Sequence, residues 1–339
     1  MLARTLGNLQ FFGRKNLRHF MEALKHSYPF DPTYGYSLED LLAVGAPEPP
    51  EDFEEFWTAR YARAMELDPS LVLMGRGPTK EGWRAHDLVY RSTGGASIGG
   101  WSLTPESGQV KRVVIVLHGY GGREEPDWHW KWNDTALLFP VARGFGRSPH
   151  PPVSANALWH VRHDIQDRDR YIHGGCVEDV WLAVSAAMQL FPEAKGRVGL
   201  IGASFGGGIG AMALAWDRRI ARAHFSVPSF GNQPLRLTLK TTGSGAAVQA
   251  AHRRNPVVVE RTLAYHDAAV AARWIEVPVH FACAMFDPMV APPGQFAIHN
   301  AVPGEKRLFI LRAGHFEYPE QADEERAMLQ EIHHFFLMF

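Results

Sequence analysis

Residues 197–216 have the sequence RVGLIGASFGGGIGAMALAW, and this stretch decides the fold. Its first half is an apolar run typical of a strand buried on both faces, and its second half is a helical run of small residues. Between them lies Gly202-Ala203-Ser204-Phe205-Gly206, a G-x-S-x-G sequence. In such a strand–turn–helix context the turn lifts the serine hydroxyl above the sheet edge, and the flanking glycines avoid a collision between strand and helix. The stretch therefore predicts a nucleophile at Ser204.

Apolar runs and helical patterns alternate on both sides of this stretch. Strand–helix–strand alternation predicts an α/β fold with a mostly parallel central sheet and helices on both faces. Ahead of it, residues 86–92 and 96–105 predict an antiparallel hairpin at a sheet edge, because a pair of glycines separates two short strand-like runs. The strands of the parallel region are expected at 112–120, 197–204, 221–227, 277–286 and 306–313, and its helices at 177–191, 207–216 and 320–338.

The N-terminal part of the chain differs from the rest in composition. Residues 1–30 are basic, with a single acidic residue, and are interpreted either as an N-terminal helix that packs on the body or as an organelle transit peptide, of which the helix is favoured. A proline-rich connector leads to a helix with Asp52 at its N-cap and an apolar stripe that faces the core. The predicted division is an N-terminal helical extension with its connector over 1–50, and one catalytic domain over 51–339.

Composition excludes several classes of protein. Of the 339 residues, 46% are hydrophobic, and 35 Lys+Arg against 36 Asp+Glu leave a formal charge of −1. This balance argues against a nucleic-acid binder and against an acidic disordered chain. The two cysteines, Cys176 and Cys283, provide no disulfide framework and suit a reducing compartment. No apolar stretch approaches the ~20 residues that span a bilayer. A cytoplasmic protein with no membrane or nucleic-acid partner is expected.

A nucleophilic serine needs a base and an orienting carboxylate, which in α/β-hydrolases follow in the order Ser, Asp, His on loops after strands. The chain offers that order. Asp287 ends the run VPVHFACAMF, and His315 follows the run KRLFILRA and a glycine. Asp267, in a helical run, and Asp323, in the last helix, are placed less well for this role. The predicted catalytic residues are therefore Ser204, Asp287 and His315.

An oxyanion needs two backbone N–H donors, and the loops after two strands supply them. Phe205 follows the nucleophile and provides the first donor. Tyr120, in HGYGG (118–122), provides the second, whereas His118 is expected to shape this loop. Residues 159–173 are rich in histidine but lack the ligand spacing of zinc hydrolases, so a polar loop, no metal and no cofactor are expected. The aromatic stretch PDWHWKW (126–132) either walls a substrate pocket or caps the core.

With these residues in place, the chain resembles the acetyl xylan esterase/cephalosporin-C deacetylase family, carbohydrate esterase family seven. The resemblance runs from about residue 35 to the C-terminus and implies the α/β-hydrolase fold, the same triad and the same oxyanion donors. The family's members are often ring-shaped hexamers, so the resemblance suggests a homo-oligomer. The segments that carry it are DFEEFW (52–57), HGYGG (118–122), ARGFGRS (142–148), YIHGGCVEDVWLAV (171–184), GASFGGG (202–208), FDPMVAPPGQFAIHN (286–300) and GHFE (314–317).

Three positions depart from the family pattern. Phe205 and Phe145 replace glutamines, which leaves open whether the pocket prefers more apolar esters or the loop merely repacks. Phe316 displaces the family's glutamate by one residue. The leading hypothesis is a serine esterase that hydrolyses small acyl esters, acetyl above all, of carbohydrates or similar alcohols, with the ester as its small-molecule partner. The alternatives are a serine peptidase of the prolyl oligopeptidase type and a non-catalytic binding protein of the same fold.

Overall fold

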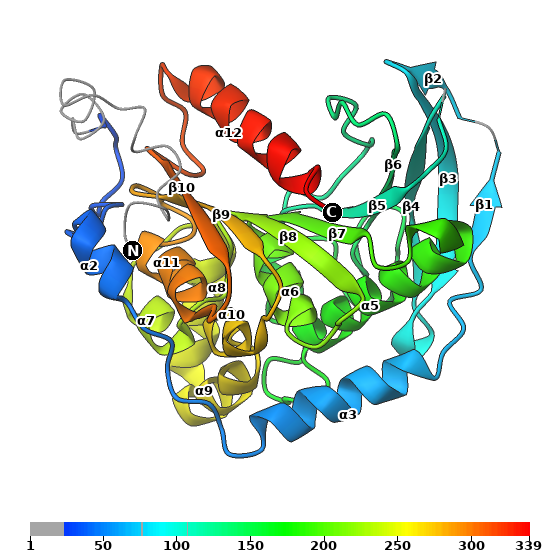
Figure 1. The fold of residues 1–339 in the computed structure, drawn as a ribbon. Helices are drawn as coiled ribbons and strands as arrows, with labels where there is room; N and C mark the ends of the chain where they lie inside the picture. Colours follow the sequence, from blue (N-terminus) through cyan, green and yellow to red (C-terminus); the bar gives the residue numbers. More distant parts are fainter. Residues whose placement is uncertain (1–23, 76, 107) are drawn as a thin grey trace.

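The computed structural model describes residues 24–75, 77–106 and 108–339, which include one ten-stranded sheet (Figure 1). The strand order is β1-β3-β4-β6-β5-β7-β8-β9-β10, and β2 pairs with β3. Neighbouring strands from β6 to β10 in this order run parallel, whereas β1 to β4 join antiparallel at one edge. The strands are β1 Val72–Met74, β2 Thr79–Lys80, β3 Trp83–Arg91, β4 Ser97–Pro105, β5 Arg112–Leu117, β6 Thr135–Pro140, β7 Val198–Ala203, β8 Ile220–Ser226, β9 Val279–Ala284 and β10 Lys306–Leu311.

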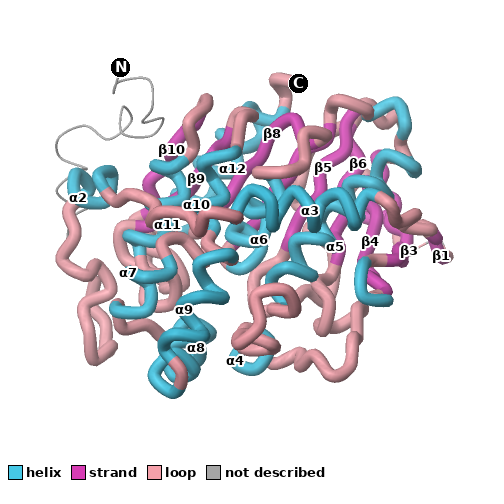
Figure 2. Tube along the Cα trace, turned by 90° about the horizontal axis from the view of Figure 1, so that it is seen from below, coloured by secondary structure: helices cyan, strands magenta, loops and turns pink. Residues whose placement is uncertain are grey.

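Helices cover both faces of the sheet, and α12 lies on the face opposite to α5 and α6 (Figure 1). Figure 2, seen from the α5–α6 side, shows α4 near α8 and α9 at one end of the strands. The helices are α2 Leu38–Ala43, α3 Phe53–Met65, α4 Ala157–His160, α5 Ile172–Leu190, α6 Phe205–Leu214, α7 Gln233–Thr238, α8 Gly243–Arg254, α9 Pro256–Tyr265, α10 Ala268–Ala271, α11 Pro292–Ala301 and α12 Gln321–Phe336, with 3₁₀ turns at Thr93–Gly95, Pro192–Ala194 and Ala272–Trp274.

The alternation of side chains along β5 explains the two layers. Val113 and Ile115 belong to the large core under α5 and α6, whereas Val114 and Val116 join a second cluster with Phe335 of α12. Successive side chains of a strand point to opposite faces, so a strand that is apolar throughout needs a cover on each side. The prediction of a mostly parallel sheet with helices on both faces is confirmed.

Some elements were not predicted. The strand β6 (Thr135–Pro140), which the sequence analysis did not predict, is fully buried and pairs with both β4 and β5. The described loop between β5 and β6 contains no helix, so the alternation that reveals the other strands is absent here. The predicted hairpin is present as β3 and β4, but β1 and β2 lie outside it. The helices α7 to α11 were not predicted, apart from the run around Asp267, which is the N-cap of α10.

The predicted capping role of Asp52 needs a correction. Asp52 is the N-cap residue of α3, but its carboxylate does not cap the helix; it accepts hydrogen bonds from Arg168, at 3.0 Å, and from Tyr265. The helix expected within residues 1–30 falls largely on residues 1–23, which lie outside the described part of the chain; residues 24–30 form no helix. The division at residue 50 stays a prediction. Over the described ranges, every helix is too short or too polar to cross a bilayer.

Candidate active site

The structure brings together the three residues that the sequence predicts as a triad. Ser204 lies in the turn between β7 and α6, Asp287 follows β9, and His315 follows β10. The Nε2 atom of His315 is 3.0 Å from Oγ of Ser204, and its Nδ1 atom is 2.8 Å from Oδ2 of Asp287. They meet because β7, β9 and β10 belong to the parallel part of the sheet, so their carboxyl ends share one edge.

Ser204 is held in a sparsely populated backbone conformation, with φ 53° and ψ −114°. The turn is so tight that a Cβ atom on Gly202 would lie 2.3 Å from the carbonyl oxygen of Gly206. A Cβ atom on Gly206 would in turn lie 2.7 Å from the carbonyl oxygen of His118. The two glycines of the G-x-S-x-G sequence are thus required by backbone contacts, and the strain at the serine is imposed by its surroundings.

Asp287 is completely buried, and its two carboxylate oxygens have separate partners. Oδ1 accepts hydrogen bonds from the backbone N–H groups of Met289, at 2.8 Å, and Val290, at 2.9 Å. Oδ2 faces His315 and accepts a further hydrogen bond from Nε2 of Gln295, at 3.0 Å. Such bonds orient the carboxylate and satisfy its charge in a site from which water is excluded.

Gln295 was not predicted from the sequence. It is buried on α11, and its Oε1 atom accepts from the backbone N–H of Ala284 at the end of β9, at 2.9 Å. Its amide nitrogen also donates to the carbonyl oxygen of Val290, at 2.6 Å. The available signal was a polar residue near the start of a helix that begins with proline and follows the aspartate loop. The direction in which the Gln295 side chain points depends, however, on how α11 packs on β9.

Two opposing effects act on the pKa of His315. Burial lowers this pKa, but the hydrogen bond to Asp287 and the negative charge of that carboxylate raise it by more, so it lies above its usual value. The side chain keeps 21% of its surface exposed. The imidazole is thus a stronger base than usual and retains an open side toward Ser204.

The two predicted oxyanion donors lie on the serine turn and on the loop next to it, where a Cβ atom on Gly119 would lie 3.6 Å from Cβ of Ser204. Phe205 is the first residue of α6, and Tyr120 lies in the loop after β5. Within the described chain, neither backbone N–H group donates a hydrogen bond to another residue. Their rings stack on each other with centroids 4.2 Å apart. The first N–H groups of a helix lack partners inside the helix and favour negative charge nearby, so this position suits an oxyanion.

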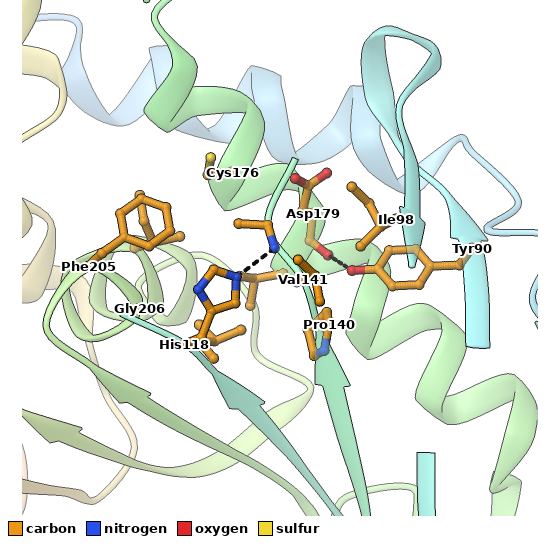
Figure 3. A pocket seen from close by; sticks show the side chains of 13 residues that line it. Tyr90, Ile98, His118, Pro140, Val141, Cys176, Asp179, Phe205 and Gly206 are labelled. Carbon is orange, nitrogen blue, oxygen red and sulfur yellow. Dashed lines mark hydrogen bonds between the residues drawn. The ribbon is translucent and has the colours of Figure 1, made fainter. Parts of the chain in front are cut away.

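Buried histidines support this loop from behind. Nε2 of His118 accepts the backbone N–H of Ala142, at 2.9 Å (Figure 3), in agreement with a role in shaping the loop. The expectation of a polar histidine loop is wrong for His160 and His173, which are fully buried. Nδ1 of His160 and Nε2 of His173 lie 3.4 Å and 3.3 Å from the hydroxyl of Tyr120. Burial lowers the pKa of both, to about 4 for His160.

These histidines do not gather with other ligand types. In the part of the chain that the structure describes, no group of three His, Cys, Asp or Glu side chains is arranged to hold a metal ion. His160 uses its Nε2 atom to contact the carbonyl oxygen of Arg143, at 3.0 Å, so both of its ring nitrogens already have protein partners.

The two phenylalanines that stand in place of the family's glutamines lie in the interior. Phe205 and Phe145 are 2% and 5% exposed, and Phe205 lines a small cavity with His118 (Figure 3). This cavity has a volume of about 20 Å³, enough for roughly one water molecule. Of the aromatic stretch 126–132, Trp130 and Trp132 pack in the cluster with Phe336 of α12, so these two cap the core.

The fold, the strained serine turn and the Ser204–His315–Asp287 array define an α/β-hydrolase. Within that class, the sequence model of the acetyl xylan esterase family matches residues 35–334, and the chain belongs to this family. It is a carboxylic ester hydrolase, with the carbohydrate esterase activity of that family.

Solved structures agree on the fold. The acetyl xylan esterase from Paenibacillus sp. R4 superimposes with a TM-score of 0.78 at 22% identity, covering 87% of this chain and 99% of that one. Acetyl xylan esterase 1 from Thermoanaerobacterium sp. JW/SL YS485 gives 0.71 at 21%, covering 89% and 99%. The acylaminoacyl peptidase from Pyrococcus horikoshii gives 0.57 at 13%, with 75% of this chain but 41% of that chain covered.

Proposed function

We propose that the protein is a serine esterase that removes small acyl groups, acetyl above all, from carbohydrates or similar alcohols through an acyl-enzyme intermediate. Ser204 is the nucleophile, His315 the general base and acid, and Asp287 the orienting carboxylate. The backbone N–H groups of Tyr120 and Phe205 bind the oxyanion. The observation that carries the proposal is the continuous hydrogen-bonded array from Ser204 through His315 to the buried Asp287.

The geometry supports a two-step reaction. Nε2 of His315 takes the proton of Ser204 as Oγ attacks the acyl carbonyl carbon, and the charge that develops on the carbonyl oxygen meets the two N–H donors. Asp287 stabilises the imidazolium, which then protonates the departing alkoxide and leaves the acyl group on Ser204. Water attacks this ester by the same sequence, with His315 again as base, and releases the acid and the free serine.

The alternatives have less support. The peptidase from Pyrococcus horikoshii is matched over 41% of its own length, whereas both acetyl xylan esterases are matched over 99%. A non-catalytic protein would not need a serine in a strained turn within hydrogen-bond distance of a histidine. The esterase proposal accounts for both observations.

The test compares the wild type with Ser204→Ala on p-nitrophenyl acetate, butyrate and octanoate and on an acetylated xylo-oligosaccharide. Removing the nucleophile should lower kcat by a factor on the order of 10⁶. Turnover should fall as the acyl chain lengthens. The matched control is Ser185→Ala on α5, whose hydroxyl contacts the carbonyl oxygen of Trp181. A Ser204→Ala variant that keeps wild-type turnover, or a wild type inactive on every ester, would overturn the proposal.

A further inference from the structure

Residues 24–34, called here the strap, precede the region matched by the family model. The strap has no helix or strand, and it lies on the same side of the molecule as β10 and α11 (Figure 1). The side chain of Asp31 fixes its turn by accepting from the N–H of Thr33, at 2.9 Å. The hydroxyl of Tyr34 donates to the carbonyl oxygen of Lys240, at 2.6 Å. Both contacts fix a segment that lacks the regular backbone hydrogen bonds of a helix or strand.

The strap contacts the triad aspartate through the backbone. The N–H group of Asp287 donates a hydrogen bond to the carbonyl oxygen of Pro32, at 3.0 Å, and Pro32 is buried. The aspartate loop is therefore held from two directions. Its carboxylate is bound by the loop's own N–H groups and by Gln295, and its peptide is bound by a segment more than 250 residues away in the sequence.

The strap also contacts the residues next to both triad partners of the serine. Phe286 immediately precedes Asp287, and its ring lies 5.4 Å from the ring of His26. Phe316 immediately follows His315, and its ring lies 6.2 Å from that of Tyr28. The rings of Phe286 and Phe316 are themselves 4.9 Å apart. A single aromatic cluster thus joins the strap to the two loops that carry the base and the carboxylate.

The loop that carries His315 needs such support. His315 has a φ of 48°, a conformation that a side chain with a Cβ atom rarely adopts. The preceding residue, Gly314, is tightly packed, since a Cβ atom on it would lie 2.4 Å from Oδ2 of Asp287. The N–H of Gly314 donates to the carbonyl oxygen of Phe286, at 2.8 Å. A strained conformation persists only where its surroundings determine it completely, and Phe316 is the next contact along the chain.

We propose that the strap, through Tyr28 and the aromatic cluster, is a positioning device that holds the His315–Asp287 pair against Ser204. This proposal rests on the triad roles proposed above. Tyr28 is a positioning residue and acts through Phe316. Two observations meet at this point: the strap lies outside the family match, and the ring of Phe316 packs against both Tyr28 and Phe286.

Loss of this positioning should change kcat and the pH dependence of the reaction in a specific way. Loss of the Tyr28 ring loosens the His315 loop, so that fewer molecules have Nε2 within hydrogen-bond distance of Ser204. Misplacement of catalytic groups by a fraction of an ångström lowers kcat, whereas acyl binding is unaffected. The contact with Asp287 raises the pKa of His315, so a looser contact lowers that pKa and moves the acidic limb of the pH–rate profile to lower pH.

The test compares Tyr28→Ala with Tyr28→Phe on p-nitrophenyl acetate. Tyr28→Ala should lower kcat about tenfold, leave KM nearly unchanged and shift the acidic limb downward. Tyr28→Phe keeps the ring and should behave as wild type. Phe316→Ala also removes the contact with Phe286, so it should lower kcat at least as much as Tyr28→Ala. The double variant should be no worse than Phe316→Ala alone, because the contact of Tyr28 with Phe316 is already lost there.

The matched control is Tyr61→Ala. Tyr61 is a half-buried tyrosine on α3 whose ring packs edge-on against Trp181, at 5.1 Å. Its loss should lower stability and leave kcat and the pH limb unchanged. If Tyr28→Ala does the same, the strap is packing only and the proposal is wrong. If Tyr28→Ala does not fold, Tyr28→Leu, which keeps volume without a ring, undergoes the same measurements.

A spectroscopic measurement separates this proposal from that of the esterase. The proton on Nδ1 of His315, shared with Asp287, should give a downfield proton NMR signal that Asp287→Asn abolishes. In Tyr28→Ala this proton should exchange with water faster than in the wild type; an unchanged rate would overturn the strap proposal. The signal does not require turnover, so it tests the strap even if the wild type hydrolyses none of the esters.

Discussion

The two sides of Ser204 are built in different ways. On the acid–base side, the contacts that orient His315 and Asp287 are hydrogen bonds of 2.8–3.0 Å. On the oxyanion side, Tyr120 is held by stacking on Phe205 and by contacts of 3.3–3.4 Å from its hydroxyl to two histidines. The first side must hold a charge in place, and the second needs only to fix two peptide groups.

This difference explains why phenylalanines are accommodated at positions 205 and 145, where the sequence departs from the family pattern. A backbone N–H donor is present whatever side chain its residue carries, so Phe205 retains the donor that the resemblance assigns to this position. Its ring and that of Phe145 pack among His118 and His160, behind the loop. An equivalent change at Gln295 would instead remove a donor from the triad carboxylate.

The largest expected effect on the acid–base side is that of Asp287→Asn, which should lower kcat on p-nitrophenyl acetate by about 10⁴-fold. The amide retains the size of the carboxylate but cannot stabilise the imidazolium or select the productive tautomer. The control is Asp217→Asn, at a buried aspartate paired with Arg219 far from the triad. A loss of less than a hundredfold would contradict the assignment of His315 and Asp287 as a pair.

A smaller effect is expected for Gln295→Leu, which should lower kcat about tenfold. Without the amide donor, more of the negative charge on Oδ2 is available to His315, whose pKa is already raised by this carboxylate. The acidic limb of kcat/KM should therefore move to higher pH, opposite in sign to the shift expected for Tyr28→Ala. Gln233→Leu, at a buried glutamine on α7, is the control, and a limb that moves downward would contradict the argument.

The acidic limb of the wild type itself is the next test. Because Asp287 raises the pKa of His315, the limb should lie above the ordinary histidine value of about 6.5. Activity should be lost as the pH falls through this value, since the protonated imidazole cannot accept the proton of Ser204. A pH–rate profile of kcat/KM on p-nitrophenyl acetate measures the limb directly, and a limb below 6 would contradict the predicted direction.

The smallest effect belongs to the oxyanion side. Tyr120→Phe removes the hydroxyl that contacts His160 and His173 but keeps the ring stack and the backbone donor. We expect kcat to stay within about threefold of the wild type and stability to fall by about 1 kcal/mol, measured by urea unfolding. Tyr90→Phe, which loses a 2.8 Å bond to a backbone carbonyl, is the comparison for stability. A hundredfold loss of kcat in Tyr120→Phe would show that the hydroxyl itself takes part.

The sequence predicted the three residues that the structure brings together, because each of them carries a local signal. Ser204 lies in a motif whose two glycines are required by close backbone contacts, that of Gly202 within the turn and that of Gly206 with His118. Asp287 and His315 each follow an apolar run in the expected order. The strand β6 had no such signal, because no helix separates β5 from β6, and the helices α7 to α11 contain no comparable motif.

The amino-acid sequence by itself determined the sheet type, the edge at which chemistry occurs and the three side chains expected there. These follow from alternation and from steric limits that act within a few residues. Only the tertiary structure decided the roles of Gln295, His160 and Tyr28, which reach the site from an adjoining helix, from the end of a short, largely exposed helix and from a distant strap. Their contacts join segments far apart in the chain, and no local pattern records which way such a side chain will face once the elements pack.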